Sequence, residues 1–473
     1  MALPGGLVAQ EVRPPVSSDA VVVVPGIMGS TLCEGEDVLW GMHRLGWYRE
    51  AWRHPESLAR LALTPAERAG DYSRITATGL LRRPAFAPFL RGLEPYGDLV
   101  DVVTASVADP AAVLEFAYDW RLPVTHNAAL LHAAAAAHLE TWRTHPRYTE
   151  MLRALPDTRP ARLVLVAHSM GGLLVRALAP GLDIRATITL GTPFDGSAQA
   201  TLILNTGRGG PVPLPRRALR DLAKTLPGLH DLLPVYRCVD DRDRDTDPRR
   251  LTPGDVAALG GDPELASAGF DMHSQTAPNP LVGHYAVVGT AQPTTASISL
   301  RDGVVEAHRC TFRLSGGVFH RNSHGVLARY QEYGDGTVPL NSAQPRGFRP
   351  ATIAQQHGPL ASCPETTGAV REILLERDPD ADRLGAGDIG VELPDIVEAD
   401  TEFAVTLTGI DGPTDATVTV HDESGVVVHC PPIHRADGRW QATVRGQPPG
   451  IHRVTVAGSG TSAITQLVLV DER

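Results

Sequence analysis

The segment with the clearest chemical meaning is Leu163–Gly172, which reads LVLVAHSMGG. An apolar run ends at Ala167, Ser169 follows two residues later, and Gly171 and Gly172 come after Met170. This pattern is typical of a nucleophile elbow, in which a tight strand-to-helix turn raises a serine hydroxyl above the edge of a sheet. The same turn leaves the amide of Met170 at the positive end of a helix, where it can stabilise an oxyanion. We therefore predict Ser169 as a nucleophile, against the alternative of a chance serine in a glycine-rich turn.

A serine hydroxyl is a weak nucleophile near neutral pH, so it needs a base that is itself oriented by a carboxylate. With a nucleophile elbow, the three residues follow the chain order serine, acid, histidine. Asp335 lies in the turn-like segment Gly334–Pro339, and His357 follows after the short apolar run Ala351–Ala354. This order predicts Asp335 as the acid and His357 as the base.

A second oxyanion donor is expected after the four-valine run Val21–Val24. The next residues, Pro25–Ser30, read PGIMGS, and their glycines let bare backbone approach a substrate. We predict that the Ile27 amide is this donor, with the Met28 amide as the alternative. A plain turn at the end of a strand is the other interpretation.

These residues must be positioned by an α/β architecture. Short, continuously apolar runs alternate with Ala- and Leu-rich helical stretches up to about residue 385, which predicts a mainly parallel sheet covered on both faces. The expected fold is an α/β-hydrolase. Its expected strands are Val21–Val24, Leu114–Tyr118, Leu163–Ala167, Ile184–Leu190, His284–Gly289 and Ala351–Ala354, and its expected helices include Asn127–Trp142 and Gly171–Ala179.

Two long insertions interrupt the alternation, at about residues 33–96 and 198–283. Insertions of this length often form lids or binding caps. The first contains Trp40 and Trp47, and aromatic side chains favour substrate clefts and lipid interfaces. We expect Trp40, Trp47 and Met28 to contact the substrate, although an ordinary packed subdomain would also fit. The Asp119–Arg121 group, between a strand and a helix, is expected to be a structural ion pair.

The composition changes after Gly385. Six short alternating runs follow, spaced by Gly-, Pro- and Asp-rich turns, as in a small antiparallel sandwich. We predict an Ig-like β-sandwich domain over residues 392–473, joined to a hydrolase domain over residues 1–385 by the linker Arg377–Ile389. The runs are Phe403–Thr408, Ala416–His421, Val426–Cys430, Trp440–Val444, His452–Ala457 and Ile464–Val470.

Charge and cysteine content exclude several classes of function. The chain of 473 residues has a net charge of −11 and no block of Lys or Arg, which disfavours nucleic-acid binding and a polybasic membrane anchor. Five scattered cysteines form no Cys-x-x-Cys pair, so neither a disulfide framework nor a metal site is indicated, and no cofactor is expected. With no secretory signal and no apolar run of transmembrane length, we expect a cytoplasmic protein.

Six motifs occur together in an order that resembles the lecithin:cholesterol acyltransferase family, which includes phospholipid:diacylglycerol acyltransferases and bacterial lipase-like members. The resemblance covers about residues 18–375 and implies an α/β-hydrolase acting on lipid or ester acyl groups. It implies Ser169 as nucleophile, Asp335 as acid, His357 as base and Ile27 as an oxyanion donor. The motifs are Val24–Ser30, Tyr118–Arg121, Ala167–Gly171, Leu190–Phe194, Gly334–Val338 and Gln356–His357.

The sequence thus predicts a serine esterase, lipase or O-acyltransferase that forms an acyl-enzyme on Ser169. Hydrolysis and transfer to an alcohol stay open, as do the acyl chain length and the head group; peripheral contact with a membrane is compatible with either reaction. An amidase or peptidase using the same triad is a further possibility. The alternative is a catalytically silent hydrolase scaffold whose C-terminal sandwich binds a protein or a glycan through its exposed strand edges.

Overall fold

The central element of the fold is a six-stranded sheet in which every pair of neighbours is parallel. Its order is β19–β10–β7–β6–β1–β5, so the mainly parallel sheet expected from the sequence is confirmed. The strands are β1 (Ala20–Val24), β5 (Val113–Glu115), β6 (Leu163–His168), β7 (Ile184–Leu190), β10 (His284–Thr290) and β19 (Ala351–Ala354). The computed structural model describes residues 16–41, 55–82, 96–154, 159–208, 214–344, 349–379, 388–458 and 462–471.

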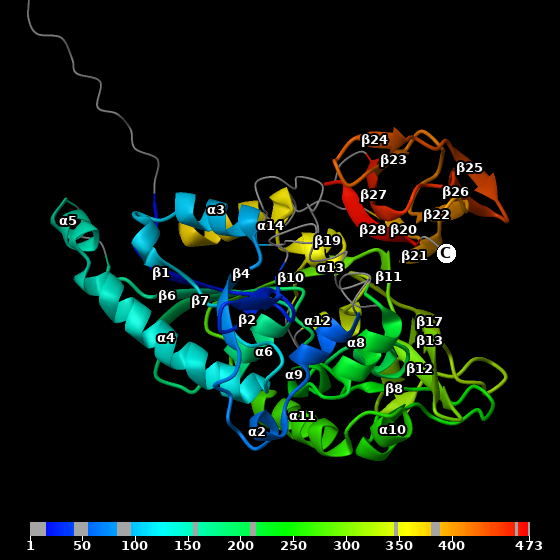
Figure 1. Ribbon diagram of the computed structural model, residues 1–473, viewed down its shortest axis with the longest axis horizontal. Coiled ribbons are helices and arrows are strands. Elements are labelled where there is room, and N and C mark those ends of the chain that lie inside the picture. Colours follow the sequence, from blue (N-terminus) through cyan, green and yellow to red (C-terminus); the bar gives the residue numbers. More distant parts are fainter. Residues whose placement is uncertain are drawn as a thin grey trace, which may run out of the picture.

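Helices cover both faces of this sheet (Figure 1). On one face α3 (Gly97–Ala105) packs beside α14 (Pro364–Leu374), and on the other α4 (Val124–Thr144) packs beside α6 (Met170–Arg176). All residues of β1 are fully buried, as expected for a strand covered on both sides. Within the described residues, no helix combines the length and the apolar character needed to cross a membrane.

The two insertions have different architectures. The first forms a three-stranded antiparallel sheet of β2 (Ser30–Glu34), β3 (Asp37–Trp40) and β4 (Thr76–Leu80), with a 3-10 helix η1 (Pro55–Leu61) and α2 (Pro65–Arg68). The second is mainly helical. Its elements are α7 (Ala198–Thr206), α8 (Arg216–Ala223), α9 (Pro227–His230), β8 (Arg237–Val239), β9 (Arg249–Arg250), α10 (Pro253–Ala258) and α11 (Pro263–Thr276).

A third excursion, which the sequence did not single out, lies between β10 and β19. It is built from short strands, and β12 and β13 join β8 and β9 of the second insertion in one sheet. Two-residue strands carry too little periodicity to be recognised from a sequence. Its elements are β11 (Gln292–Pro293), β12 (Ser297–Arg301), β13 (Val304–His308), β14 (Cys310–Thr311), β15 (Leu314–Ser315), β16 (Val318–Phe319), β17 (Tyr330–Gln331), β18 (Tyr333–Gly334) and α12 (Leu340–Ala343). After β19 the chain forms the short helix α13 (His357–Leu360).

The C-terminal region consists of two packed sheets, as expected. A four-stranded sheet, β20–β22–β26–β25, shares an apolar core with a five-stranded sheet, β21–β28–β27–β23–β24. The first sheet contains β20 (Gly390–Glu392), β22 (Phe403–Thr408), β25 (Ile433–Ala436) and β26 (Arg439–Val444). The second contains β21 (Ile396–Glu398), β23 (Ala416–His421), β24 (Val427–His429), β27 (Gly450–Gly458) and β28 (Ile464–Asp471). The sequence analysis did not expect β20, β21 and β25.

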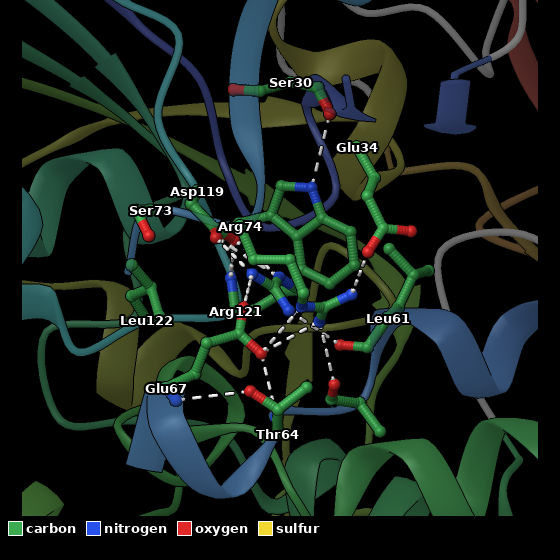
Figure 2. Close-up of polar contacts among 12 residues, drawn as sticks. Ser30, Glu34, Leu61, Thr64, Glu67, Ser73, Arg74, Asp119, Arg121 and Leu122 are labelled. Atoms are coloured by element: carbon green, nitrogen blue, oxygen red, sulfur yellow. Dashed lines mark hydrogen bonds and ion pairs between the residues drawn. The ribbon is translucent and has the colours of Figure 1, made fainter. Parts of the chain in front are cut away.

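A buried ionic network joins the first insertion to the hydrolase core (Figure 2). Arg121 is fully buried and donates to both carboxylate oxygens of Asp119, with its Nη2 2.6 Å from Asp119 Oδ2. The same nitrogen lies 2.7 Å from Glu67 Oε1, and Nη1 donates to the carbonyl oxygen of Leu61. The ion pair expected between Asp119 and Arg121 is thus extended by Glu67, which belongs to the insertion.

Glu67 stays ionised although it is buried. Burial alone would raise the pKa of its carboxyl, but hydrogen bonds from the Thr64 amide, Arg74 and Arg121 outweigh burial and lower this pKa to about 2. The network is therefore a set of compensated charges, in which removal of one partner leaves the others buried and unpaired.

We expect Arg121→Met to lower the free energy of unfolding by about 3–5 kcal/mol, because Asp119 and Glu67 would keep buried charges without their main partner. Urea unfolding followed by tryptophan fluorescence measures this change. The matched control is Arg60→Met, which removes the ion pairs of a half-exposed arginine with Glu34 and Asp37 and should change the free energy of unfolding far less, because water screens exposed ion pairs. Equal losses in the two variants would contradict the compensated network.

Candidate active site

Ser169 occupies a strained turn between β6 and α6. Its backbone has φ 53° and ψ −125°, a conformation that costs energy for any residue except glycine and that is typical of nucleophile elbows. The Ser169 amide donates to the carbonyl oxygen of Leu190 at the end of β7, at 2.8 Å. The turn thus has the geometry that the sequence pattern predicts.

The small residues after Ser169 are required by close contacts. A Cβ atom on Gly171 would lie 2.5 Å from the carbonyl oxygen of Pro25, and one on Gly172 would lie 1.9 Å from Thr192 Oγ1. Ala167 is fully buried at the position where glycine is more common in such elbows.

The structure brings the three predicted side chains together. His357 Nδ1 lies 2.6 Å from Asp335 Oδ2, and His357 Nε2 lies 2.8 Å from Ser169 Oγ. Because a carboxylate only accepts hydrogen bonds, Nδ1 carries the proton, which leaves Nε2 of a neutral imidazole free to accept from the serine hydroxyl. Ser169 and Asp335 are buried, whereas the His357 side chain is 13% exposed. This arrangement can transfer the serine proton to a base during nucleophilic attack.

Asp335 is held from several sides. Its Oδ1 accepts hydrogen bonds from the amides of Thr337 and Val338, at 2.9 and 2.7 Å, which leaves Oδ2 for His357. The His357 amide also donates to the Asp335 carbonyl oxygen at 2.8 Å. Main-chain and side-chain hydrogen bonds therefore fix Asp335 and His357 relative to each other.

Two glycines that the sequence analysis did not select make room for this pair. A Cβ on Gly289, near the end of β10, would lie 2.4 Å from Asp335 Cβ. A Cβ on Gly191, just after β7, would lie 3.1 Å from Asp335 Oδ2 and 3.2 Å from His357 Nδ1. The position of each glycine at the end of an apolar strand could have indicated these close contacts from the sequence.

The loop after β1 lies directly against Ser169. A Cβ on Gly26 would be 2.8 Å from Ser169 Cβ, so only glycine allows this approach. Gly29 donates to the Gly26 carbonyl oxygen, which makes Ile27 and Met28 the central residues of a tight turn. Met28 has φ 61°, which is unusual for a residue with a side chain. The turn's own hydrogen bond uses neither the Ile27 nor the Met28 amide, so both predicted donors stay candidates.

A buried hydrogen-bond chain connects this loop to His357. The Gly26 amide donates to the Tyr96 hydroxyl oxygen at 2.7 Å, and Tyr96 OH lies 2.8 Å from His168 Nδ1. His168 Nε2 lies 3.0 Å from the carbonyl oxygen of His357, which can only accept. Nε2 of His168 therefore carries the proton, and the Tyr96 hydroxyl donates to Nδ1. These hydrogen bonds fix the loop beside Ser169 relative to the backbone of His357.

His168 is neutral in this chain. Complete burial, together with the nearby His357 imidazole, lowers the pKa of His168 to about 3 from an ordinary value near 6.5. A neutral His168 keeps one donor and one acceptor nitrogen, which the chain from Gly26 to His357 requires. Tyr96 could not be recognised from the sequence, because its contacts with Gly26 and His168 exist only in the folded protein.

Ser169 and His357 line a cavity of about 630 Å³, and Asp335 is buried behind His357. Trp40 and Met28, both expected near the substrate, line it as well, and Trp40 Nε1 donates to the Met28 carbonyl oxygen at 2.8 Å. Trp47 lies outside the described residues. The second insertion supplies a largely apolar wall: Ala200, Ile203, Leu214, Leu219, Leu222, Ala223, Leu226, Leu229 and Leu232.

Comparison with known proteins points to the same class as the geometry. Residues 94–247, about a third of the chain, match the sequence model of the family "Lecithin:cholesterol acyltransferase". Comparison with curated proteins gives no match.

Solved structures resemble the chain at low identity. A chain of the Tle4–Tli4 complex is 15% identical, with 75% of this chain and 98% of that chain covered and a TM-score of 0.44. Bacillus licheniformis lipase BlEst2 in its mature form is 16% identical, with 77% and 94% covered and a TM-score of 0.27. The M1 domain from titin is 13% identical over 16% of this chain and 84% of that chain, with a TM-score of 0.13.

The parallel sheet, the strained serine turn and the residues grouped around it define the α/β-hydrolase class. Within this class, residues 94–247 are similar to the lecithin:cholesterol acyltransferase family, which is the family that the sequence motifs resemble. The match supports, in general terms, a protein that hydrolyses or transfers lipid acyl groups.

The low pKa of His168 predicts a pH-dependent contribution to stability. Between about pH 6.5 and pH 3 the unfolded state binds a proton at His168 that the folded state does not, so stability falls as pH falls. Glutamine cannot protonate, so the stability advantage of the wild type over His168→Gln should shrink by about 2 kcal/mol from pH 7 to pH 5. Urea unfolding at the two pH values measures this difference. Other buried histidines contribute equally to both proteins, and an advantage independent of pH would contradict a neutral His168.

Proposed function

We propose that this protein is a serine-dependent lipid or ester acyl hydrolase or O-acyltransferase, with Ser169 as nucleophile, His357 as base and Asp335 as orienting acid. The observation that carries the proposal is that His357 bridges Ser169 Oγ and Asp335 Oδ2 at 2.8 and 2.6 Å beside a largely apolar cavity. A hydrogen-bonded set of this kind activates a hydroxyl that is otherwise unreactive near neutral pH.

In the first half-reaction, Ser169 Oγ attacks the carbonyl carbon of the ester while His357 Nε2 takes the hydroxyl proton. Asp335 holds the imidazole in the correct tautomer and stabilises the imidazolium that forms. The amides of Met170 and of Ile27, or Met28 in its place, donate to the oxyanion. The C–O bond to the leaving alcohol then breaks, and His357 returns the proton to that alcohol, which leaves an acyl group on Ser169.

In the second half-reaction, water or another alcohol attacks the acyl-enzyme with His357 again as base. Water gives hydrolysis, and an alcohol gives transfer. Mass analysis of the products formed with and without an added long-chain alcohol distinguishes the two. The cytoplasmic location, peripheral contact with a membrane and the binding of a protein or glycan by the C-terminal sheets stay predictions.

We expect Ser169→Ala to lower kcat for p-nitrophenyl esters by about 10⁴–10⁶. A fluorophosphonate probe should label the wild type at Ser169 and leave the variant unlabelled, as measured by peptide mass spectrometry. Equal labelling of the variant would remove Ser169 as the nucleophile. Absence of turnover in the wild type with esters of several chain lengths would favour the silent scaffold.

Gly26→Ala tests the loop beside the nucleophile. The added Cβ would lie 2.8 Å from Ser169 Cβ, so the loop must move away from the serine. A displacement of about 1 Å in such a site lowers kcat by about 10²-fold. The matched control is Gly79→Ala, where the added Cβ meets no atom within 4 Å and activity should be unchanged. Full activity in Gly26→Ala would argue against an oxyanion donor in this loop.

A further inference from the structure

The five-stranded C-terminal sheet has two apolar faces. Along β28, Ile464 and Val468 belong to the core between the two C-terminal sheets. Leu467 and Leu469, which point to the opposite face, pack in the core of the hydrolase. A strand with only one buried face would alternate apolar with polar residues, so this pattern indicates that the outer face is covered as well.

The covered outer face extends across neighbouring strands. Leu469 pairs with Ile396 of β21 on one side and with Ile451 of β27 on the other. Ile451 is buried in the hydrolase core, and Ile396 packs against it. This face therefore belongs to the interior of the protein, and Figure 1 shows the C-terminal sheets lying beside α13 and β11 of the hydrolase.

Polar contacts fix the junction next to His357. Gln292 is fully buried; its Nε2 donates to the Ile389 carbonyl oxygen at 2.9 Å, and its Oε1 accepts from the Val391 amide at 3.1 Å. The same oxygen accepts from Gln356 Nε2 at 3.2 Å, and Gln356 directly precedes the proposed base. One side chain thus connects the start of the C-terminal sheets with the loop that carries His357.

The edge of this junction reaches the cavity that contains Ser169. Leu393, Ile396 and Leu467 line the cavity together with Leu214 and Leu219 of the second insertion. Two acidic groups at this edge have polar neighbours: Glu392 pairs with Arg309, and Asp395, an exposed residue, lies near Arg216 and within 3.5 Å of Gln466 Nε2. The apolar side chains of Leu393, Ile396 and Leu467 form a hydrocarbon surface in this part of the cavity, and the polar and charged residues lie beside it.

We propose that the C-terminal sheets complete the substrate site, and that Leu393 and Leu467 bind the distal part of the acyl chain of the ester. The proposal rests on the esterase or acyltransferase function proposed above. Each methylene in contact with this surface should raise kcat/KM by about fourfold, so the effect grows with chain length. A region that the sequence marks as accessory is then a determinant of acyl-chain specificity.

Leu467→Trp and Leu393→Phe test the proposal by placing larger side chains in this part of the cavity. The measured quantity is the ratio of kcat/KM for p-nitrophenyl dodecanoate to that for p-nitrophenyl butyrate. We expect this ratio to fall at least tenfold in both variants, through a higher KM for the dodecanoate. The matched control is Val427→Trp, at a half-exposed position in β24 of the same sheet, which should leave the ratio unchanged. An unchanged ratio in both cavity variants would overturn the proposal.

A binding measurement separates this inference from the proposed function. Fluorescence of 11-(dansylamino)undecanoic acid reports binding of an acyl chain without any turnover. Weaker binding in Leu467→Trp than in Val427→Trp supports the acyl site even if the wild type cleaves no ester, in which case the proposed function alone fails. Equal binding in the two variants contradicts the acyl site whether or not the protein is an esterase.

Discussion

The backbone of Ser169 is held in a conformation that an isolated serine avoids, and several contacts of the surrounding structure stabilise it. The turn is fixed by β6 within the parallel sheet, by the hydrogen bond to Leu190 and by the contact of Gly171 with the loop after β1. The contact of Gly171 also places the loop after β1 beside the Ser169 hydroxyl. The strain at Ser169 and the convergence of the site are therefore consequences of the same packing.

Two hydrogen-bond systems converge on His357 from different directions. Asp335 fixes the imidazole through Nδ1, and His168 fixes the backbone of the same residue through its carbonyl oxygen. The second system continues through Tyr96 to Gly26, beside the expected oxyanion donors. His357 and the loop after β1 are consequently positioned as one unit, although they are more than 300 residues apart in the sequence.

Much of the fold and the grouping of the three site residues could be predicted, because their signals are local. Apolar runs mark the parallel strands, and Ser169, Asp335 and His357 each follow or precede a recognisable turn. The role of Tyr96 could not be predicted, because its hydroxyl forms hydrogen bonds with Gly26 and His168, which are far from it in the sequence. The strands between β10 and β19 were not predicted, because strands of two residues are too short to show a periodic pattern. The contact between Leu467 and the hydrolase was not predicted. The alternating strands of the C-terminal sheets are typical of a separate domain, so nothing in the sequence indicated this contact.

The double role of β28 has a consequence for biosynthesis. Its side chains enter two cores in alternation, and it follows every hydrolase element in the sequence. A polypeptide made from its N-terminus therefore contains the whole parallel sheet and Ser169 before β28, whose Leu467 lines the cavity, has been added. Until then the apolar side chains that pack against Leu467 and Leu469 lack these partners.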